Sequence, residues 1–222
     1  FMSIVLERLN KVQADISQRN NNPNPSTKII AVTKTFELDH VKPLINHGHI
    51  HFGENKVQEA TNKWKETKKL NAKIKLHMLG KLQTNKVKSA VEIFDYIHSL
   101  DNKKLADTIK KYENQMGKKL FHFIQVNFAD EKQKSGILPS DAVSFYGYCK
   151  NEIHLNVIGL MCFPPFGKDP TSFFKLAYDL NNKLELKELS MGMSNDYLQA
   201  IKLGSTYVRV GSAIFGERKS NE

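Results

Sequence analysis

The sequence has few cysteines and no long apolar run, and these two absences exclude several classes of protein. Cys149 and Cys162 are the two cysteines among 222 residues, too few for a disulfide framework and without the spacing of a metal site. No apolar stretch approaches the roughly 20 residues that cross a bilayer. Polar and acidic residues close behind Met2 argue against a secretory signal. We therefore predict a cytoplasmic protein with no membrane partner.

Motifs of several enzyme classes are also missing. The chain has no G-x-G-x-x-G dinucleotide loop, no Walker-type phosphate loop and no G-x-S-x-G nucleophile elbow. His47, His49 and His51 alternate, but no cysteine or carboxylate nearby completes a set of metal ligands. We predict no metal and interpret these histidines as structural.

The formal net charge of +10 raises nucleic acid as a partner. The lysines, however, are spread along the chain in several short groups, one of which is Lys63, Lys65, Lys68 and Lys69. This distribution is typical of the solvated outer faces of several helices and not of one binding stripe. We predict no nucleic-acid partner.

Short apolar runs alternate with stretches of helical spacing along most of the chain. Eight runs are candidate strands: residues 28–34, 50–52, 76–79, 96–100, 120–126, 157–162, 188–191 and 207–210. The first helical stretch repeats apolar residues at Val5, Leu9, Val12 and Ile16, which form one helical face. Strands that alternate with single helices imply crossover connections and a parallel sheet.

Eight such units fit a closed (β/α)₈ TIM barrel with one added helix at the N-terminus. A doubly wound open sheet is the alternative, and periodicity does not separate the two. No low-complexity linker or change of composition divides the chain, so we predict a single domain over residues 1–222.

Lys34 stands at the end of the first strand, where a parallel barrel places its active-site loops. Partial burial there lowers the pKa of a lysine, because the charged form loses solvation. A neutral amine is what Schiff-base chemistry requires. A lysine that extends its ammonium group to solvent from a strand end is the simpler interpretation of this residue alone.

The ends of the last two strands are rich in small and hydroxyl residues. Gly211 and Ser212 follow the eighth strand, in the position of the phosphate site that many barrels carry after strands seven and eight. Arg209 lies on that strand and could face the same pocket as a fixed cation. Ser194 and Gly204 are better explained as the N-cap and C-cap of a helix over 195–203.

Polar residues also follow the second and third strands. Asn55 and Thr84 come shortly after Gly53 and Gly80, and both are adequate helix N-caps. Local sequence favours capping for both.

These segments together resemble the pyridoxal phosphate homeostasis protein family, whose barrel is related to that of alanine racemase. The matching segments are Ala31-Val32-Thr33-Lys34, Phe52-Gly53-Glu54-Asn55, Val57-Gln58-Glu59, Leu79-Gly80, Leu82-Gln83, Asn85-Lys86, Val126-Asn127, Lys134-Ser135-Gly136, Gly159-Leu160-Met161, residues 189–196, Gly204-Ser205-Thr206, Arg209, Gly211, Phe215-Gly216 and Arg218. They cover nearly the whole chain in order.

The resemblance implies pyridoxal 5′-phosphate (PLP) as the cofactor, held as a Schiff base on Lys34. It implies Ser190, Gly211 and Ser212 as phosphate ligands and Arg209 as the neighbour of the pyridine nitrogen. A cation there discourages protonation of that nitrogen and weakens the ring as an electron sink. Asn55 and Met161 are further expected to line the pocket.

Three positions depart from the family pattern. Lys56 stands in place of a tyrosine, Lys81 in place of a histidine and Cys162 in place of a threonine. The first two are expected near the mouth of the pocket, where they change the exposed surface that a partner would contact.

The resemblance implies a non-catalytic protein of vitamin B6 homeostasis, with PLP-dependent apo-enzymes as further partners. A PLP-dependent amino-acid racemase is the alternative. Racemisation needs a base on each face of the substrate carbanion, and the related racemases take one of them from a second, all-β domain. The chain shows no such domain and no tyrosine within the matched motifs, so we expect a monomer without catalytic function.

Overall fold

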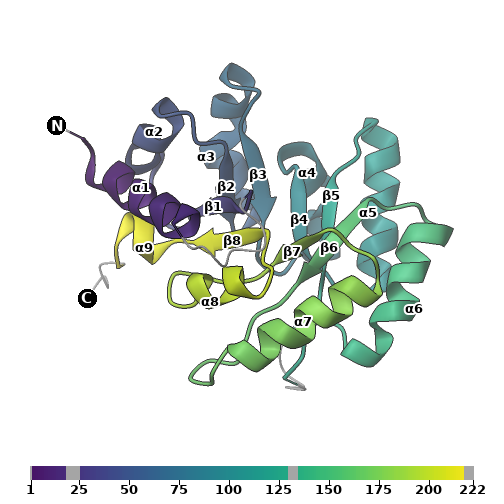
Figure 1. Ribbon diagram of the computed structural model, residues 1–222. Helices are drawn as coiled ribbons and strands as arrows, with labels where there is room; N and C mark the ends of the chain where they lie inside the picture. Colours follow the sequence, from purple (N-terminus) through teal and green to yellow (C-terminus); the bar gives the residue numbers. More distant parts are fainter. Residues whose placement is uncertain (1, 19–25, 130–134, 218–222) are drawn as a thin grey trace.

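The computed structural model describes residues 2–18, 26–129 and 135–217, and its strands close into one parallel barrel (Figure 1). The strands are β1 (Lys28–Val32), β2 (His51–Glu54), β3 (Lys75–Met78), β4 (Tyr96–Leu100), β5 (Phe121–Gln125), β6 (Val157–Met161), β7 (Glu188–Ser190) and β8 (Tyr207–Val210). Each strand pairs with the next, and β8 pairs back onto β1. The predicted TIM barrel is therefore confirmed, and the open sheet is excluded.

Helices follow the strands and cover the outside of the barrel. They are α1 (Ile4–Ser17), α2 (Leu38–Asn46), α3 (Val57–Leu70), α4 (Val87–Ile93), α5 (Lys103–Met116), α6 (Ala142–Gly147), α7 (Thr171–Lys183), α8 (Tyr197–Lys202) and α9 (Ser212–Phe215), with short turns at Thr84–Lys86, Pro139–Asp141 and Tyr148–Glu152. None of the helices in the described ranges is long and apolar enough to cross a membrane.

Helix α1 is the predicted addition at the N-terminus, and it packs beside the end of the chain. Its buried residues are Val5, Leu9, Val12 and Ile16, the four that the sequence places on one helical face. This face contacts α2, α8 and α9, and α1 lies next to α9 in Figure 1. The first and last helices thus cover the same side of the barrel.

The barrel strands bury both of their faces, because side chains alternate between the interior and the surrounding helices. Along β1, Ile29 and Ala31 join the large apolar layer under the helices, whereas Ile30 and Val32 join a separate interior cluster. The other buried members of that interior cluster are Leu79, Tyr96, Phe123, Met161 and Tyr207.

Three histidines form a polar column inside this interior. His51 Nδ1 lies 2.9 Å from His77 Nε2, and His77 Nδ1 lies 2.8 Å from His98 Nε2. The ring of His77 stacks on Tyr96 and that of His98 on Phe123. Burial lowers the pKa of His51 to about 4 and places the pKa values of His77 and His98 well below the ordinary range. The imidazoles are therefore neutral at physiological pH, and His51 has the structural role expected from the sequence.

The histidine column makes the stability of the protein depend on pH. An unfolded histidine binds a proton below a pH of about 6.5, whereas the folded column stays neutral. The neutral column therefore makes its full contribution to the free energy of unfolding above that pH. This contribution falls as the pH decreases from about 6.5 toward about 4. We expect His77→Phe to flatten this dependence near pH 5.5 by about 1.4 kcal/mol per pH unit.

Urea unfolding of wild type and His77→Phe at several pH values between 7 and 5 measures the two slopes. His47→Asn, which changes an exposed histidine, is the control and keeps the wild-type slope. Equal slopes in wild type and His77→Phe would show that His77 is not held neutral by burial.

Candidate functional site

A cavity of about 650 Å³ lies at the carboxyl ends of β1, β7 and β8, beside the loop that follows β6. Lys34, Arg209, Gly211 and Ser212 all line it. Its other lining residues are Val32, Phe36, Phe163, Pro164, Pro165, Phe166, Gly167, Lys168, Pro170, Met193, Ser194, Asn195, Asp196, Gln199 and Gly216. Four of the seven residues selected from the sequence therefore meet in one cavity.

Arg209 is the buried cation of this cavity. Arg209 is 2% exposed, and the centre of the Phe163 ring lies 4.5 Å from its guanidinium carbon. Nη1 donates to Ser190 Oγ over 2.7 Å, and Nη2 donates to the Cys162 carbonyl over 3.0 Å. Burial lowers the pKa of Arg209 to about 10, which still leaves the group charged at neutral pH.

The third nitrogen of this guanidinium, Nε, differs from the other two. Arg209 Nε is buried and has no hydrogen-bond partner among the residues that the structure describes. A buried donor without a partner costs about 1–3 kcal/mol. Nη1 and Nη2 each have a partner, so Nε is the nitrogen of the guanidinium whose N–H is available to an acceptor.

The start of α9 provides backbone donors beside the cavity. Ser194 Oγ accepts from the N–H of Gly211 over 3.3 Å and from the N–H of Ala213 over 3.1 Å. The prediction that Ser194 caps the helix after β7 is wrong: α8 has Asp196 in the capping position and no side-chain cap. Ser194 stabilises α9 instead, because the fold brings the two loops together. Gly204 follows the end of α8 with φ of +97°, as expected of a residue that ends a helix.

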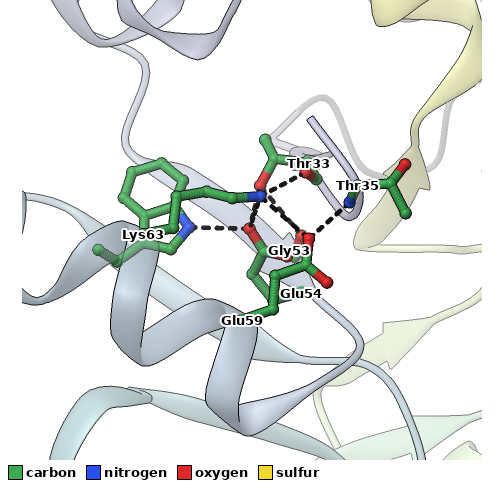
Figure 2. A network of polar contacts seen from close by, with 7 residues as sticks. Thr33, Thr35, Gly53, Glu54, Glu59 and Lys63 are labelled. Carbon is green, nitrogen blue, oxygen red and sulfur yellow. Dashed lines mark hydrogen bonds and ion pairs between the residues drawn. The ribbon is translucent and has the colours of Figure 1, made fainter. Parts of the chain in front are cut away.

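Lys34 is half-buried in the short loop after β1, and polar groups from β2 and α3 hold that loop (Figure 2). Lys63 Nζ donates to the Thr33 carbonyl over 2.7 Å. Glu59 Oε1 accepts from the Thr35 N–H over 2.6 Å. Thr35 has φ of +67°, a region that is costly for a β-branched residue. The chain is thus held in a sharp turn on both sides of Lys34.

The anchor of this network is the carboxylate of Glu54, which is fully buried. Its Oε1 accepts from Thr33 Oγ over 2.6 Å, from Lys63 Nζ over 2.8 Å and from Trp64 Nε1 over 2.9 Å. Figure 2 shows Thr33 and Lys63 approaching this carboxylate from the loop after β1 and from α3. Sequence reasoning matched Glu54 and Glu59 to the family pattern but missed Lys63, which it interpreted as a surface lysine.

Three of the seven selected residues lie outside the cavity of Lys34. Asn55 lines a second cavity of about 330 Å³ with Gly80, Lys81 and Asn127, and Phe163 borders both cavities. Asn55 does not cap α3, which begins after Lys56 without a side-chain cap.

Met161 and Ser190 are fully buried in the barrel interior. Met161 packs in the same cluster as Val32, which lines the Lys34 cavity. The Ser190 hydroxyl contacts Arg209 and His98 Nδ1. Both residues therefore lie beneath the cavity and not in its wall.

The three departures from the family pattern have different surroundings. Cys162 is buried, and burial raises the pKa of its thiol to about 12, so the thiol stays protonated while its carbonyl accepts from Arg209. Lys56 and Lys81 are both exposed, and Lys81 lines the second cavity.

Comparison with known proteins shows which family the chain belongs to. The family model "Alanine racemase, N-terminal domain" matches residues 8–219. A pyridoxal phosphate homeostasis protein of Pasteurella multocida is 35% identical over 96% of this chain and 97% of its own length. The chain belongs to the pyridoxal phosphate homeostasis protein family.

Solved structures extend the comparison to the fold. PipY of Synechococcus elongatus, solved with PLP bound, is 33% identical, covers 96% of this chain and all of its own, and superposes with a TM-score of 0.86. An alanine racemase of Clostridium difficile is 15% identical and superposes with a TM-score of 0.72, over 98% of this chain and 57% of its own. The racemase shares the barrel fold alone.

The network around Glu54 leads to a prediction about stability. Lys63→Met removes the only lysine that contacts the buried carboxylate in the described ranges, and breaking a buried ion pair costs about 3–5 kcal/mol. Lys65→Met changes an exposed lysine on the same helix and is expected to change the free energy of unfolding by less than about 0.5 kcal/mol. Urea unfolding of both variants measures the difference. A loss below about 1 kcal/mol, the value of an exposed pair, for Lys63→Met would contradict a buried network.

Proposed function

We propose that this chain binds PLP in the cavity of Lys34 and Arg209 and serves the homeostasis of this cofactor. The observation that carries the proposal is Arg209 Nε, a buried donor without a partner among the described residues, on a side chain that lines the same cavity as Lys34. A pyridine nitrogen is an acceptor suited to that donor. The PipY structure, which was solved with PLP bound, supports the same ligand.

The start of α9 suits the phosphate of this ligand. Gly211 and Ser212 line the cavity, and the N–H groups of Gly211 and Ala213 are held by one serine hydroxyl. A phosphate dianion is a stronger acceptor for such donors than a neutral hydroxyl. Ser190, Asn55 and Met161 stay predictions as ligands, and Ser190 contributes in this arrangement by holding Arg209.

PLP supplies an aldehyde that condenses with a primary amine, with loss of water. Lys34 would provide that amine from a loop that Lys63 and Glu59 hold at both sides. Arg209, cationic and fixed at two of its nitrogens, would donate to the pyridine nitrogen without giving it a proton. A ring kept neutral in this way is a weak electron sink.

This arrangement supports a carrier more than an enzyme. The relative from Pasteurella multocida is named a homeostasis protein, and the racemase shares only the fold. No tyrosine lines the cavity of Lys34 among the described residues, so no phenol is placed there as a second base. We propose a non-catalytic role, with a PLP-dependent racemase as the alternative.

The surroundings of the cavity support a protein that passes PLP to apo-enzymes. Phe163, Phe166 and Met193 line the cavity and are exposed, and exposed apolar side chains at a ligand site suit contact with another protein. Both cysteines are free and buried, which suits a reducing compartment. We propose a monomer that acts in the cytoplasm.

The cofactor assignment is tested by absorbance. Wild type incubated with PLP and freed of excess is expected to show a visible band that borohydride removes, with the reduced mass on Lys34. Lys34→Ala is expected to lose the band. Lys81→Ala removes the exposed lysine of the second cavity and is expected to keep it. An unchanged band in Lys34→Ala, or a reduced mass on another lysine, would overturn the assignment.

The non-catalytic role is tested by chiral analysis. PLP-loaded protein incubated with L-alanine or D-alanine is expected to produce the other enantiomer no faster than free PLP with lysine does. Steady turnover that disappears in Lys34→Ala would instead establish the racemase alternative and leave the cofactor site in place.

A further inference from the structure

Lys34 is one of the two central residues of a tight turn. The Phe36 N–H donates to the Thr33 carbonyl over 3.1 Å, which closes a four-residue turn around Lys34 and Thr35. Thr35 has φ of +67°, whereas Lys34 is not among the described residues with positive φ. A positive φ at the third residue alone is the mark of a type II turn, which favours glycine or asparagine there. Threonine is a costly residue for this position, because its Cβ crowds the backbone.

A hydrogen bond to the backbone keeps Thr35 in this conformation. Its side chain is exposed, so little packing acts on it, but its N–H donates to Glu59 Oε1 over 2.6 Å. This N–H belongs to the peptide group between Lys34 and Thr35, which is the group that rotates when a type II turn converts into a type I turn. Rotation would direct the N–H away from Glu59. The carboxylate therefore favours the strained form of the turn.

Lys63 fixes the position of this carboxylate. Its Nζ lies 3.3 Å from Glu59 Oε1 and 2.8 Å from Glu54 Oε1, and it donates to the Thr33 carbonyl over 2.7 Å. These three acceptors match the three N–H groups of an ammonium. Figure 2 shows Glu59 and Lys63 facing Thr35 and Thr33 from one helix. The turn is thus held before and after Lys34 by one ion pair on α3.

The turn also contacts the opposite wall of the cavity. The ring of Phe36 stacks on Phe215 with 5.1 Å between the ring centres, and Phe215 is the last residue of α9. Phe36 and Lys34 both line the cavity of Arg209. The conformation of the turn therefore determines how the Lys34 side chain enters a cavity whose other wall is already fixed.

We propose that Glu59 is a positioning residue for Lys34, because it holds the turn in the one strained form that the structure shows. The inference rests on the proposed PLP site, since Lys34 is the amine that would meet the aldehyde there. Without the acceptor at Glu59, the turn divides between its two forms. Only a fraction of the molecules then presents Lys34 as in the structure, and the apparent affinity for PLP falls in proportion to that fraction.

The turn is tested first in ligand-free protein by NMR. In wild type we expect a one-bond Cα–Hα coupling of Thr35 that indicates positive φ, and amide exchange of Thr35 slowed by about tenfold or more by its charged acceptor. Glu59→Ala is expected to remove both signatures. Glu59→Gln retains an acceptor oxygen and is expected to keep them. Glu66→Ala removes an exposed glutamate of the same helix and is the matched control, with no change expected.

The effect on Lys34 is tested by titration with PLP, followed by absorbance, under conditions in which every variant is folded. Glu59→Ala is expected to weaken PLP binding about tenfold, or about 1.4 kcal/mol, the order of the cost of one strained residue. Glu59→Gln and Glu66→Ala are expected to bind as wild type does.

A second substitution separates positioning from general structural support. Glycine adopts positive φ without a steric cost, so the turn no longer needs its acceptor in the Thr35→Gly background. There we expect Glu59→Ala to weaken PLP binding by less than about threefold. If Glu59 only supported the fold, its loss would be as severe in this background as in wild type.

The outcomes distinguish this inference from the proposed function. If Glu59→Ala keeps the positive φ of Thr35, keeps wild-type affinity for PLP, or weakens binding equally with and without Thr35→Gly, Glu59 does not position Lys34. If wild type forms no PLP adduct on Lys34, the proposed function fails, and the role of the turn in PLP binding fails with it.

Discussion

The pairing of β8 with β1 is the constraint on which the rest of the structure depends. It sets Arg209 beside Ile30 in the closing register, so that residues from opposite ends of the chain line one cavity. Lys34 follows β1 at the rim of the barrel, and Gly211 and Ser212 follow β8 and line the same cavity. Without closure these side chains would belong to different surfaces.

The closed barrel also determines how Arg209 is held. The Ser190 hydroxyl and the Cys162 carbonyl each accept a hydrogen bond from one terminal nitrogen of Arg209. The ring of Phe163 covers the guanidinium face. A charge buried this deeply requires partners, and neutral imidazoles extend those partners across the barrel. The polar interior and the cavity are therefore one connected system, with the charge at the cavity end.

Much of this fold could be predicted from the sequence, because strand and helix periodicities are local. The face of α1 was evident from the spacing of Val5, Leu9, Val12 and Ile16, and the small residues after β8 indicated a site near Lys34. Local signals failed where the fold brings distant segments together. Ser194 has the features of a cap for the helix that follows it, yet it serves α9. His51, His77 and His98 lie on three strands, so no short motif contains them. Lys63 resembles its exposed neighbours, and only the buried position of Glu54 distinguishes it.

A crystal structure of the protein grown with PLP tests the central claim most directly. We predict density continuous from Lys34 Nζ into the ligand, the pyridine nitrogen within hydrogen-bonding distance of Arg209 Nε, and the phosphate at the start of α9. PLP seated in the cavity of Asn55 and Lys81, or joined to another lysine, would contradict the assignment of Lys34 and Arg209 as the PLP site.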